Sequence, residues 1–132
     1  MKKTTKEWVK KAEQDYVLAK QGSRSKVPVH DGVAFHCQQC VEKYLKAFME
    51  ELGHTVPKTH DLDALLTAIA SNYPTLRPLR RGLLFLSDFA VDVRYPGKSA
   101  SKRQAVAALR WATRVRTLAR TFLGIRERRR TK

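Results

Sequence analysis

Residues 34–52 read AFHCQQCVEKYLKAFMEEL, and this stretch decides the fold class. Its apolar side chains recur every three or four residues, at Ala34, Cys37, Val41, Tyr44 or Leu45, Phe48 and Leu52. That spacing is typical of one face of an α-helix. The pattern predicts a long amphipathic helix that begins at His30 or Asp31 and ends at Gly53.

Four further segments with helical spacing lie on either side of this helix. They cover about residues 5–20, 59–72, 76–93 and 101–122, with Ser99 or Ser101 as the cap of the last one. Thr59 is predicted to cap the short third helix, with Asp61 and Asp63 in its first turn, where the helix dipole favours negative charge. No segment shows sustained period-two alternation. We therefore predict an all-α fold, an antiparallel up-and-down bundle of four long helices and one short helix.

The length of 132 residues fits one domain with one hydrophobic core. Residues 1–124 are expected to form this domain, and residues 125–132 a basic disordered tail, because the tail is too short and too charged to pack. The first residues precede no apolar segment of a secretion signal, and no apolar stretch is long enough to cross a membrane. The chain is therefore expected in the cytoplasm, without a membrane partner.

The net charge is the unusual feature of the composition. The chain has 27 Lys and Arg against 12 Asp and Glu, which gives +15 and favours a polyanionic partner. Residues 1–26 hold eight basic and three acidic side chains, residues 27–101 hold eight of each, and residues 102–132 hold eleven basic and one acidic. The excess thus lies at the two ends of the chain. These ends form one basic face if they lie side by side.

Cys37 and Cys40 are spaced like a redox or metal motif. Both fall inside the predicted helix rather than at its N-terminus, where the dipole would lower the pKa of a thiol. His36, His54 and His60 are present, but no second pair of ligands with zinc spacing completes a site. The favoured interpretation is two core cysteines, with no metal and no cofactor expected.

The opposite flank of the same helix is polar and carries Gln38, Gln39, Glu42, Lys43, Lys46 and Glu50. Glu42 and Lys46 are four residues apart in the order that stabilises a helix. One interpretation is a solvated face with an intrahelical ion pair, and the other is a functional surface.

Two shorter motifs are also candidates for function. Thr59-His60-Asp61-Leu62 places an imidazole and a carboxylate beside the exposed N–H groups of a helix start, or is simply a cap. Asp92-Val93-Arg94-Tyr95-Pro96 ends an apolar helix with an arginine whose planar guanidinium suits phosphate or carboxylate. A structural role for Arg94, satisfying the last carbonyls of a helix, is the alternative.

Three of these motifs together resemble the HEPN domain (higher eukaryotes and prokaryotes nucleotide-binding), in a subgroup with an Arg-Tyr-Pro motif. They are the run from Phe35 to Phe48, the segment Gly53 to Leu62 with Pro57-Lys58-Thr59-His60-Asp61-Leu62, and Val93-Arg94-Tyr95-Pro96-Gly97. Trp8, Ala12 and Asp15-Tyr16 are similar to the opening pattern of the family. The resemblance covers residues 5–122 and implies an up-and-down helical bundle that forms a homodimer.

The resemblance also implies two kinds of function. Many HEPN proteins are metal-independent ribonucleases of toxin–antitoxin or defence systems, with a signature of Arg, four to six residues, and His. Arg24 and His30 have this spacing, but they lie in a loop rather than in a late helix, and no histidine follows Arg94. Other members accompany a minimal nucleotidyltransferase and are proposed to bind nucleotide or RNA.

Our first hypothesis is therefore a dimeric module that binds nucleotide or RNA and works with a nucleotidyltransferase partner. Arg94 would hold a phosphate and Tyr95 would stack on a base, while Lys43, Lys46 and His60 line the same cleft and Gln39 and Glu42 orient it. The second hypothesis is a metal-independent endoribonuclease, with Arg94 as the cation and His60 as the base. The third is a protein-interaction adaptor without catalysis.

Overall fold

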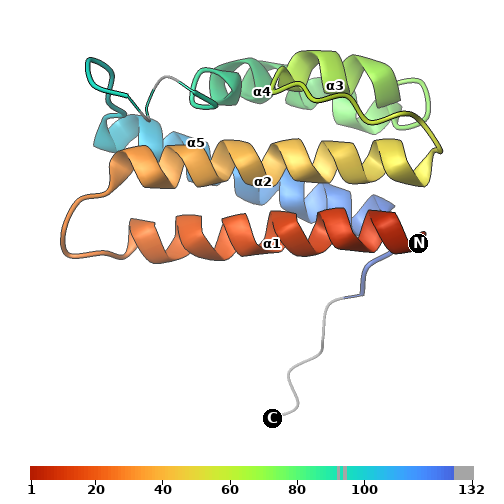
Figure 1. Ribbon diagram of the computed structural model, residues 1–132, viewed down its shortest axis with the longest axis horizontal. Helices are drawn as coiled ribbons and strands as arrows, with labels where there is room; N and C mark the ends of the chain where they lie inside the picture. The colour runs from red at the N-terminus through yellow and green to blue at the C-terminus, as the bar shows by residue number, and fades with distance from the viewer. Residues whose placement is uncertain (92, 94, 127–132) are drawn as a thin grey trace, which may run out of the picture.

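The computed structural model describes residues 1–91, 93 and 95–126, and all regular secondary structure in this part of the chain is helical, with no strand. The elements are α1 (Lys3–Ser23), α2 (His30–Glu51), α3 (Leu62–Ile69), the 3₁₀ helix η1 (Pro74–Leu79), α4 (Arg80–Ser87) and α5 (Lys102–Phe122). The predicted all-α helical bundle is confirmed (Figure 1).

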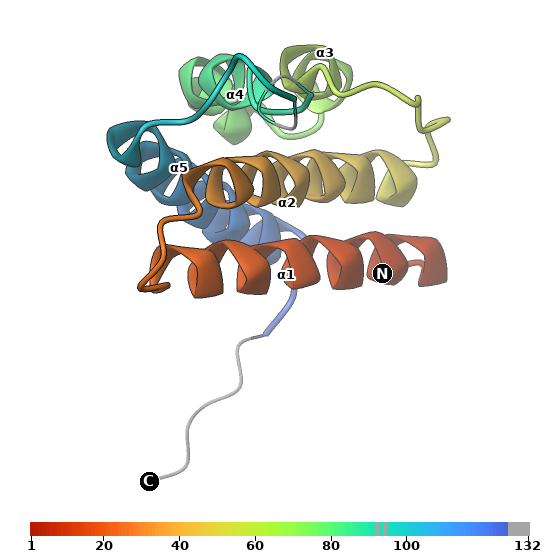
Figure 2. The same ribbon diagram turned by 60° about the vertical axis from the view of Figure 1, so that its left-hand side comes forward.

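Helix α2 is the central element of the bundle. It contacts α1, α3, α4 and α5, and it lies between α1 on one side and the α3–α4 layer on the other (Figures 1 and 2). Its apolar row is buried from Ala34 to Phe48, with Tyr44 and Phe48 among the largest enclosed side chains, and Leu52 at its end is partly buried. Each such side chain contributes about 1.5–3 kcal/mol on burial, so the periodic row quoted from the sequence holds the bundle together.

The ends of α2 and α5 agree with the sequence prediction, whereas the start of α3 does not. Gly53 follows α2 with a φ of 76°, and Ser101 caps α5 in a reciprocal pair with Gln104. The N-cap of α3 is Asp61, whose side chain accepts from the Ala64 N–H at 3.1 Å. The predicted Thr59 cap is wrong, because the Thr59 hydroxyl instead accepts from the backbone N–H of Asp61.

The fourth predicted helix, over residues 76–93, is divided and ends early. Residues 74–79 form η1, which contains Pro78, and α4 ends at Ser87. Proline lacks a backbone donor and its ring clashes with a continuous α-helix, so the tighter 3₁₀ turn precedes α4. The N–H groups of Phe89 and Ala90 bond to carbonyls three residues back, which closes the last turn.

The end of α5 carries slightly more ordered structure than predicted. Ile125 packs partly buried against the core, and its N–H donates to the Arg120 carbonyl at 2.9 Å. The remainder of the predicted tail, residues 127–132, lies outside the described residues. None of the described helices combines the length and the apolar composition that crossing a bilayer needs.

Candidate functional site

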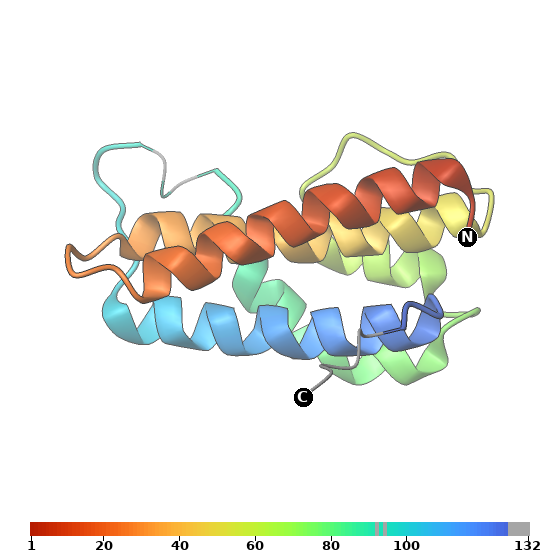
Figure 3. The ribbon, with the colours of Figure 1, turned by 90° about the horizontal axis from the view of Figure 1, so that it is seen from below.

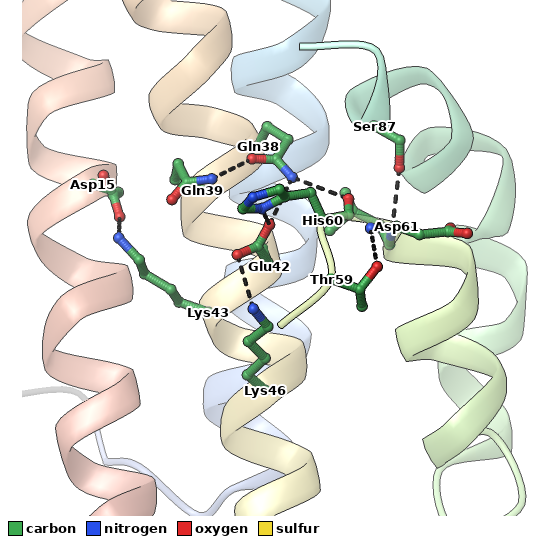
Figure 4. A network of polar contacts seen from close by, with 11 residues as sticks. Asp15, Gln38, Gln39, Glu42, Lys43, Lys46, Thr59, His60, Asp61 and Ser87 are labelled. Atoms are coloured by element: carbon green, nitrogen blue, oxygen red, sulfur yellow. Dashed lines mark hydrogen bonds and ion pairs between the residues drawn. The ribbon is translucent and has the colours of Figure 1, made fainter. Parts of the chain in front are cut away.

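A buried polar network lies on the flank of α2 that faces the start of α3. Gln38, Glu42 and Lys46 follow one another at four-residue spacing and are 0, 3 and 6 % exposed. The Glu42 carboxylate accepts from Gln38 Nε2 at 3.1 Å, from Lys46 Nζ at 3.1 Å and from His60 Nδ1 at 2.7 Å (Figure 4). We call Gln38, Glu42, Lys46 and His60 the Glu42 network. The expected intrahelical ion pair between Glu42 and Lys46 is present, but the burial of Gln38, Glu42 and Lys46 shows that these three residues do not form a solvated face.

His60 reaches this network from the segment between α2 and α3. Its backbone carbonyl accepts from Gln38 Nε2 at 3.4 Å, and the Asp61 cap immediately after it fixes the chain where α3 begins. The helix start is held further by Ser87 of α4, whose hydroxyl accepts from the Leu62 N–H at 3.2 Å. The backbone on both sides of the imidazole is therefore anchored.

The geometry of His60 favours one tautomer of its neutral ring. A carboxylate oxygen accepts hydrogen bonds, so this tautomer carries its hydrogen on Nδ1, facing Glu42, and its lone pair on Nε2. The side chain of His60 is 52 % exposed, and Nε2 has no hydrogen-bond partner among the described residues. The imidazole thus combines a buried carboxylate on one nitrogen with a solvent-accessible acceptor on the other.

A second cluster lies on the flank of α2 that faces α1. The carboxylate of Asp15, buried on α1, accepts from His36 Nδ1 at 2.8 Å and from Lys43 Nζ. We call these three residues the Asp15 cluster. Gln39 lies between it and the Glu42 network and donates to Gln38 Oε1 at 2.7 Å (Figure 4).

Charge is balanced across this polar face of α2. Asp15 is paired with Lys43, and Glu42 is paired with Lys46, so each lysine has a carboxylate partner. The Lys46 ammonium also lies 5.6 Å from the centre of the Trp8 ring, in cation–π range. The face therefore offers directional hydrogen-bonding groups rather than a large positive potential.

The positive excess lies instead on α1 and α5, which run side by side (Figure 3). Lys3, Lys6, Lys10 and Lys11 are exposed on α1, and Lys102, Arg103, Arg110 and Arg114 are exposed on α5. We call these eight residues the basic surface. The sequence of α5 contains no acidic residue. The two charged ends of the chain therefore form neighbouring helices. These helices run antiparallel, so the start of α1 and the start of α5 lie toward opposite ends of the bundle (Figure 3).

Glu13 and Tyr16 join α1 to α5. Glu13 accepts two hydrogen bonds from Arg116, at 2.7 and 2.8 Å, and one from the Tyr44 hydroxyl at 2.6 Å. Tyr16 and Thr113 are hydrogen-bonded at 3.0 Å. Burial tends to raise the pKa of Glu13, but the bonds from Arg116 and Tyr44 outweigh it and hold the pKa below its ordinary value. The hydrogen bonds with Glu13 in turn raise the pKa of Arg116.

The two cysteines are buried in the core, as predicted. Cys37 and Cys40 have no exposed surface, and burial raises the pKa of Cys37 to about 12 and that of Cys40 well above its ordinary value. No group of three or more His, Cys, Asp or Glu side chains among the described residues could hold a metal ion. These thiols act as small apolar side chains.

Five of the seven predicted site residues come together in the described structure. Gln39, Glu42, Lys43, Lys46 and His60 share the polar face of α2 (Figure 4). Tyr95 is 60 % exposed on the segment that joins α4 to α5. Arg94 lies outside the described residues, and α4 ends well before it in the sequence.

The polar face of α2 also includes three residues that the sequence motifs did not assign to it, namely Asp15, His36 and Trp8. A signal for Asp15 was present, because Trp8, Ala12, Asp15 and Ala19 have the spacing of one buried helix face. A carboxylate in such a row needs a partner on the neighbouring helix. His36 and Lys43 supply it, and both lie within one helical repeat of the Glu42 network.

The fold and site define a helical bundle whose central helix carries a buried, charge-balanced polar face beside a separate basic surface. The sequence profile of the HEPN domain matches residues 5–122. The chain therefore belongs to the HEPN domain family.

Two crystal structures are similar to this chain in fold. One is TT1696 from Thermus thermophilus, with a TM-score of 0.76 and 17 % sequence identity over 89 % of this chain and 96 % of that one. The other is ST0689, an archaeal HEPN homologue, with a TM-score of 0.73 and 22 % identity over 93 % of this chain and 99 % of that one. No curated protein matches the sequence significantly.

Proposed function

We propose that this HEPN domain binds RNA or a nucleotide, with attraction and recognition assigned to different helices. The single observation that carries the proposal is the pairing of α1 and α5, which brings the two charged ends of the chain together. Cations carried by two neighbouring helices attract a phosphate backbone without regard to sequence. The basic surface then supplies the general affinity.

Recognition is assigned to the polar face of α2 and to the segment after α4. Gln39, Lys43 and His60 present donors and acceptors of fixed orientation at its edge, since each is held by a neighbour. Arg94 would hold a phosphate with its planar guanidinium, and the exposed Tyr95 ring would stack on a base. The buried Glu42 and Lys46 orient these groups rather than contact the ligand.

The partner in this proposal is a minimal nucleotidyltransferase, and the domain acts as a homodimer in a toxin–antitoxin or defence-type system. The support is the family membership together with the RNA-binding role proposed above. Co-expression with an adjacent nucleotidyltransferase gene product tests it. A stable complex on size exclusion supports the partnership, and separate elution of the two proteins contradicts it.

The binding proposal is tested with a fluorescent single-stranded RNA and with ATP as the nucleotide probe. Binding of RNA that weakens steeply between about 50 and 200 mM salt is expected, because counterions are released from the phosphates. His60→Gln should reduce discrimination between RNA sequences while leaving the salt dependence unchanged. Absence of RNA and nucleotide binding at low salt would contradict the proposal.

A second candidate function, metal-independent RNA cleavage, is favoured by the Glu42–His60 pair. The 2.7 Å bond fixes the ring so that Nε2 can take a proton, and the exposed side chain is accessible to a substrate. The step would be removal of the 2′-OH proton by His60, attack of the 2′-oxygen on phosphorus, and departure of the 5′-oxygen with a proton from solvent. Arg94 is the proposed cation for the phosphate.

Cleavage is measured with radiolabelled RNA in EDTA at high protein concentration. The ribonuclease hypothesis predicts fragments with 2′,3′-cyclic phosphate ends, which His60→Ala and Arg94→Ala abolish. Intact RNA with the wild-type protein, or fragments that persist in His60→Ala, would exclude this role for His60.

A further inference from the structure

A groove lies between the end of α1 and the first half of α5, on the side of α2 away from the Glu42 network. Its volume is about 720 Å³, within the range of pockets that hold ligands. The first turn of α2 and the loop before it form the floor, through Pro28, Val29 and Val33. The groove begins next to the hydrogen bond between Tyr16 and Thr113, where α1 and α5 meet.

The interior of this groove is aliphatic. On α5, Val106 and Leu109 line it at helical spacing between Lys102 and Thr113. Val106 is 50 % exposed and Val29 is 42 % exposed, so apolar surface remains open to solvent both on α5 and on the loop before α2. These four α5 residues occupy positions i, i+4, i+7 and i+11 of one helix face, with the two aliphatic side chains at its centre. A second helix packs along a face with this spacing.

The rim of the groove has one sign of charge. Its titratable lining residues are Lys26, His30, Lys102, Arg110 and Arg114, with no Asp or Glu among them. An occupant that fits must therefore carry aliphatic side chains toward the floor and carboxylates toward the rim. A second copy of this chain is a poor match, because its net charge is +15. RNA is also a poor match, since the interior is aliphatic and no Phe, Tyr or Trp ring lines it for base stacking.

We infer that this α1–α5 groove binds an acidic amphipathic helix of a partner protein. The apolar floor supplies affinity by excluding water, and the rim selects partners by charge. This inference does not depend on RNA binding by the polar face of α2, and it gives Lys102, Arg110 and Arg114 of the basic surface a second role at the rim of the groove. It adds a protein-docking site to a chain whose proposed ligand is a nucleotide or RNA.

The test uses the full chain and a labelled peptide of about 16 residues with leucines along one helical face and glutamates on the other. A scrambled peptide of identical composition and a single-stranded RNA of equal charge are the comparison ligands. The patterned peptide should bind at least about tenfold more tightly than the scrambled one. Two variants probe the groove, Val106→Asp in its aliphatic interior and the pair Lys102→Glu with Arg110→Glu on the rim.

Both groove variants should weaken peptide binding at least about tenfold, while the pair Lys6→Glu with Lys10→Glu, which makes the same charge change as the rim pair at two exposed α1 positions, should not. Thermal unfolding checks that each variant is folded. Equal binding of the two peptides overturns the inference. A loss of RNA affinity in the rim variant with no response to Val106→Asp makes the groove part of the nucleic-acid surface instead. Dissociation of a dimer by Val106→Asp would identify a second copy as the occupant.

Discussion

Replacing Glu42 by glutamine should destabilise the protein far more than most polar substitutions. Glu42 is 3 % exposed and is the ion-pair partner of Lys46, which is itself 6 % exposed. Glutamine keeps the size of the side chain but leaves the Lys46 ammonium buried without a counterion. Removing one partner of a buried pair costs about 3–5 kcal/mol, a large part of the stability of a domain.

The loss of stability caused by Glu42→Gln can be measured as a decrease in the melting temperature. For a chain of this length the unfolding entropy predicts a decrease in Tm of roughly 10 °C for about 3 kcal/mol. Urea unfolding followed by circular dichroism gives the free energy of unfolding directly. The matched control is Glu50→Gln on the same helix, because Glu50 is only partly buried and accepts from Thr4 and Trp8 at 3.1 and 3.4 Å. We expect a cost below about 1 kcal/mol for that control.

A double variant separates the effect of the unpaired buried charge from the effect of the changed side-chain shape. Glu42→Leu with Lys46→Met removes both buried charges, and such apolar replacements are often neutral. We therefore expect the double variant to be more stable than Glu42→Gln by about 2 kcal/mol or more. The reasoning is refuted if Glu42→Gln is as mild as Glu50→Gln. It is also refuted if the double variant is no more stable than Glu42→Gln.

Three further predictions concern packing, thiol reactivity and acid stability. Gly82→Ala should lower the free energy of unfolding, measured in urea, by about 1–3 kcal/mol, because a Cβ there would lie 2.2 Å from the ring of Trp111. Gly32→Ala, which has open space around the new Cβ, should stabilise α2 by up to about 1 kcal/mol. Ellman's reagent at pH 8 should not label the cysteines of the folded protein, because burial raises the pKa of each thiol, and it should label both in urea. Rapid labelling of the native protein would contradict the burial of these thiols. Glu13 has a pKa below its ordinary value of 4.5, so its stabilisation is complete above that pH and is lost as the pH falls through the lowered folded pKa. Glu13→Gln should flatten the acid limb of a stability–pH profile, and an unchanged limb would contradict this.

The helices could be predicted from the sequence because each buries one periodic apolar row. The row from Ala34 to Leu52 specified α2, and Ser101 with Gln104 specified the start of α5. The bounds of the fourth helix could not be predicted in the same way, since its apolar row continues through Val93 and is buried even where the helix has ended. Periodicity reports burial of a face, whereas the end of a helix depends on local hydrogen bonds.

The candidate site was predictable in composition but not in its environment. The polar flank of α2 was visible, yet its burial depends on two neighbours that approach from outside the helix. Asp15 comes from α1, and His60 comes from the segment that turns back after Gly53. The Glu42–His60 bond joins residues 18 apart in sequence, so only the tertiary packing of α3 against α2 brings them together.

The central claim is that α1 and α5 form one basic surface that binds RNA. The most direct test is the slope of log affinity against log salt for single-stranded RNA, compared among three proteins. Each lost phosphate contact reduces the slope by about 0.7, so the α1 pair Lys6→Ala with Lys10→Ala and the α5 pair Arg103→Ala with Arg114→Ala should each reduce it by about 1.4. An unchanged slope in either pair, or no RNA binding by the wild-type protein at low salt, would contradict a shared surface.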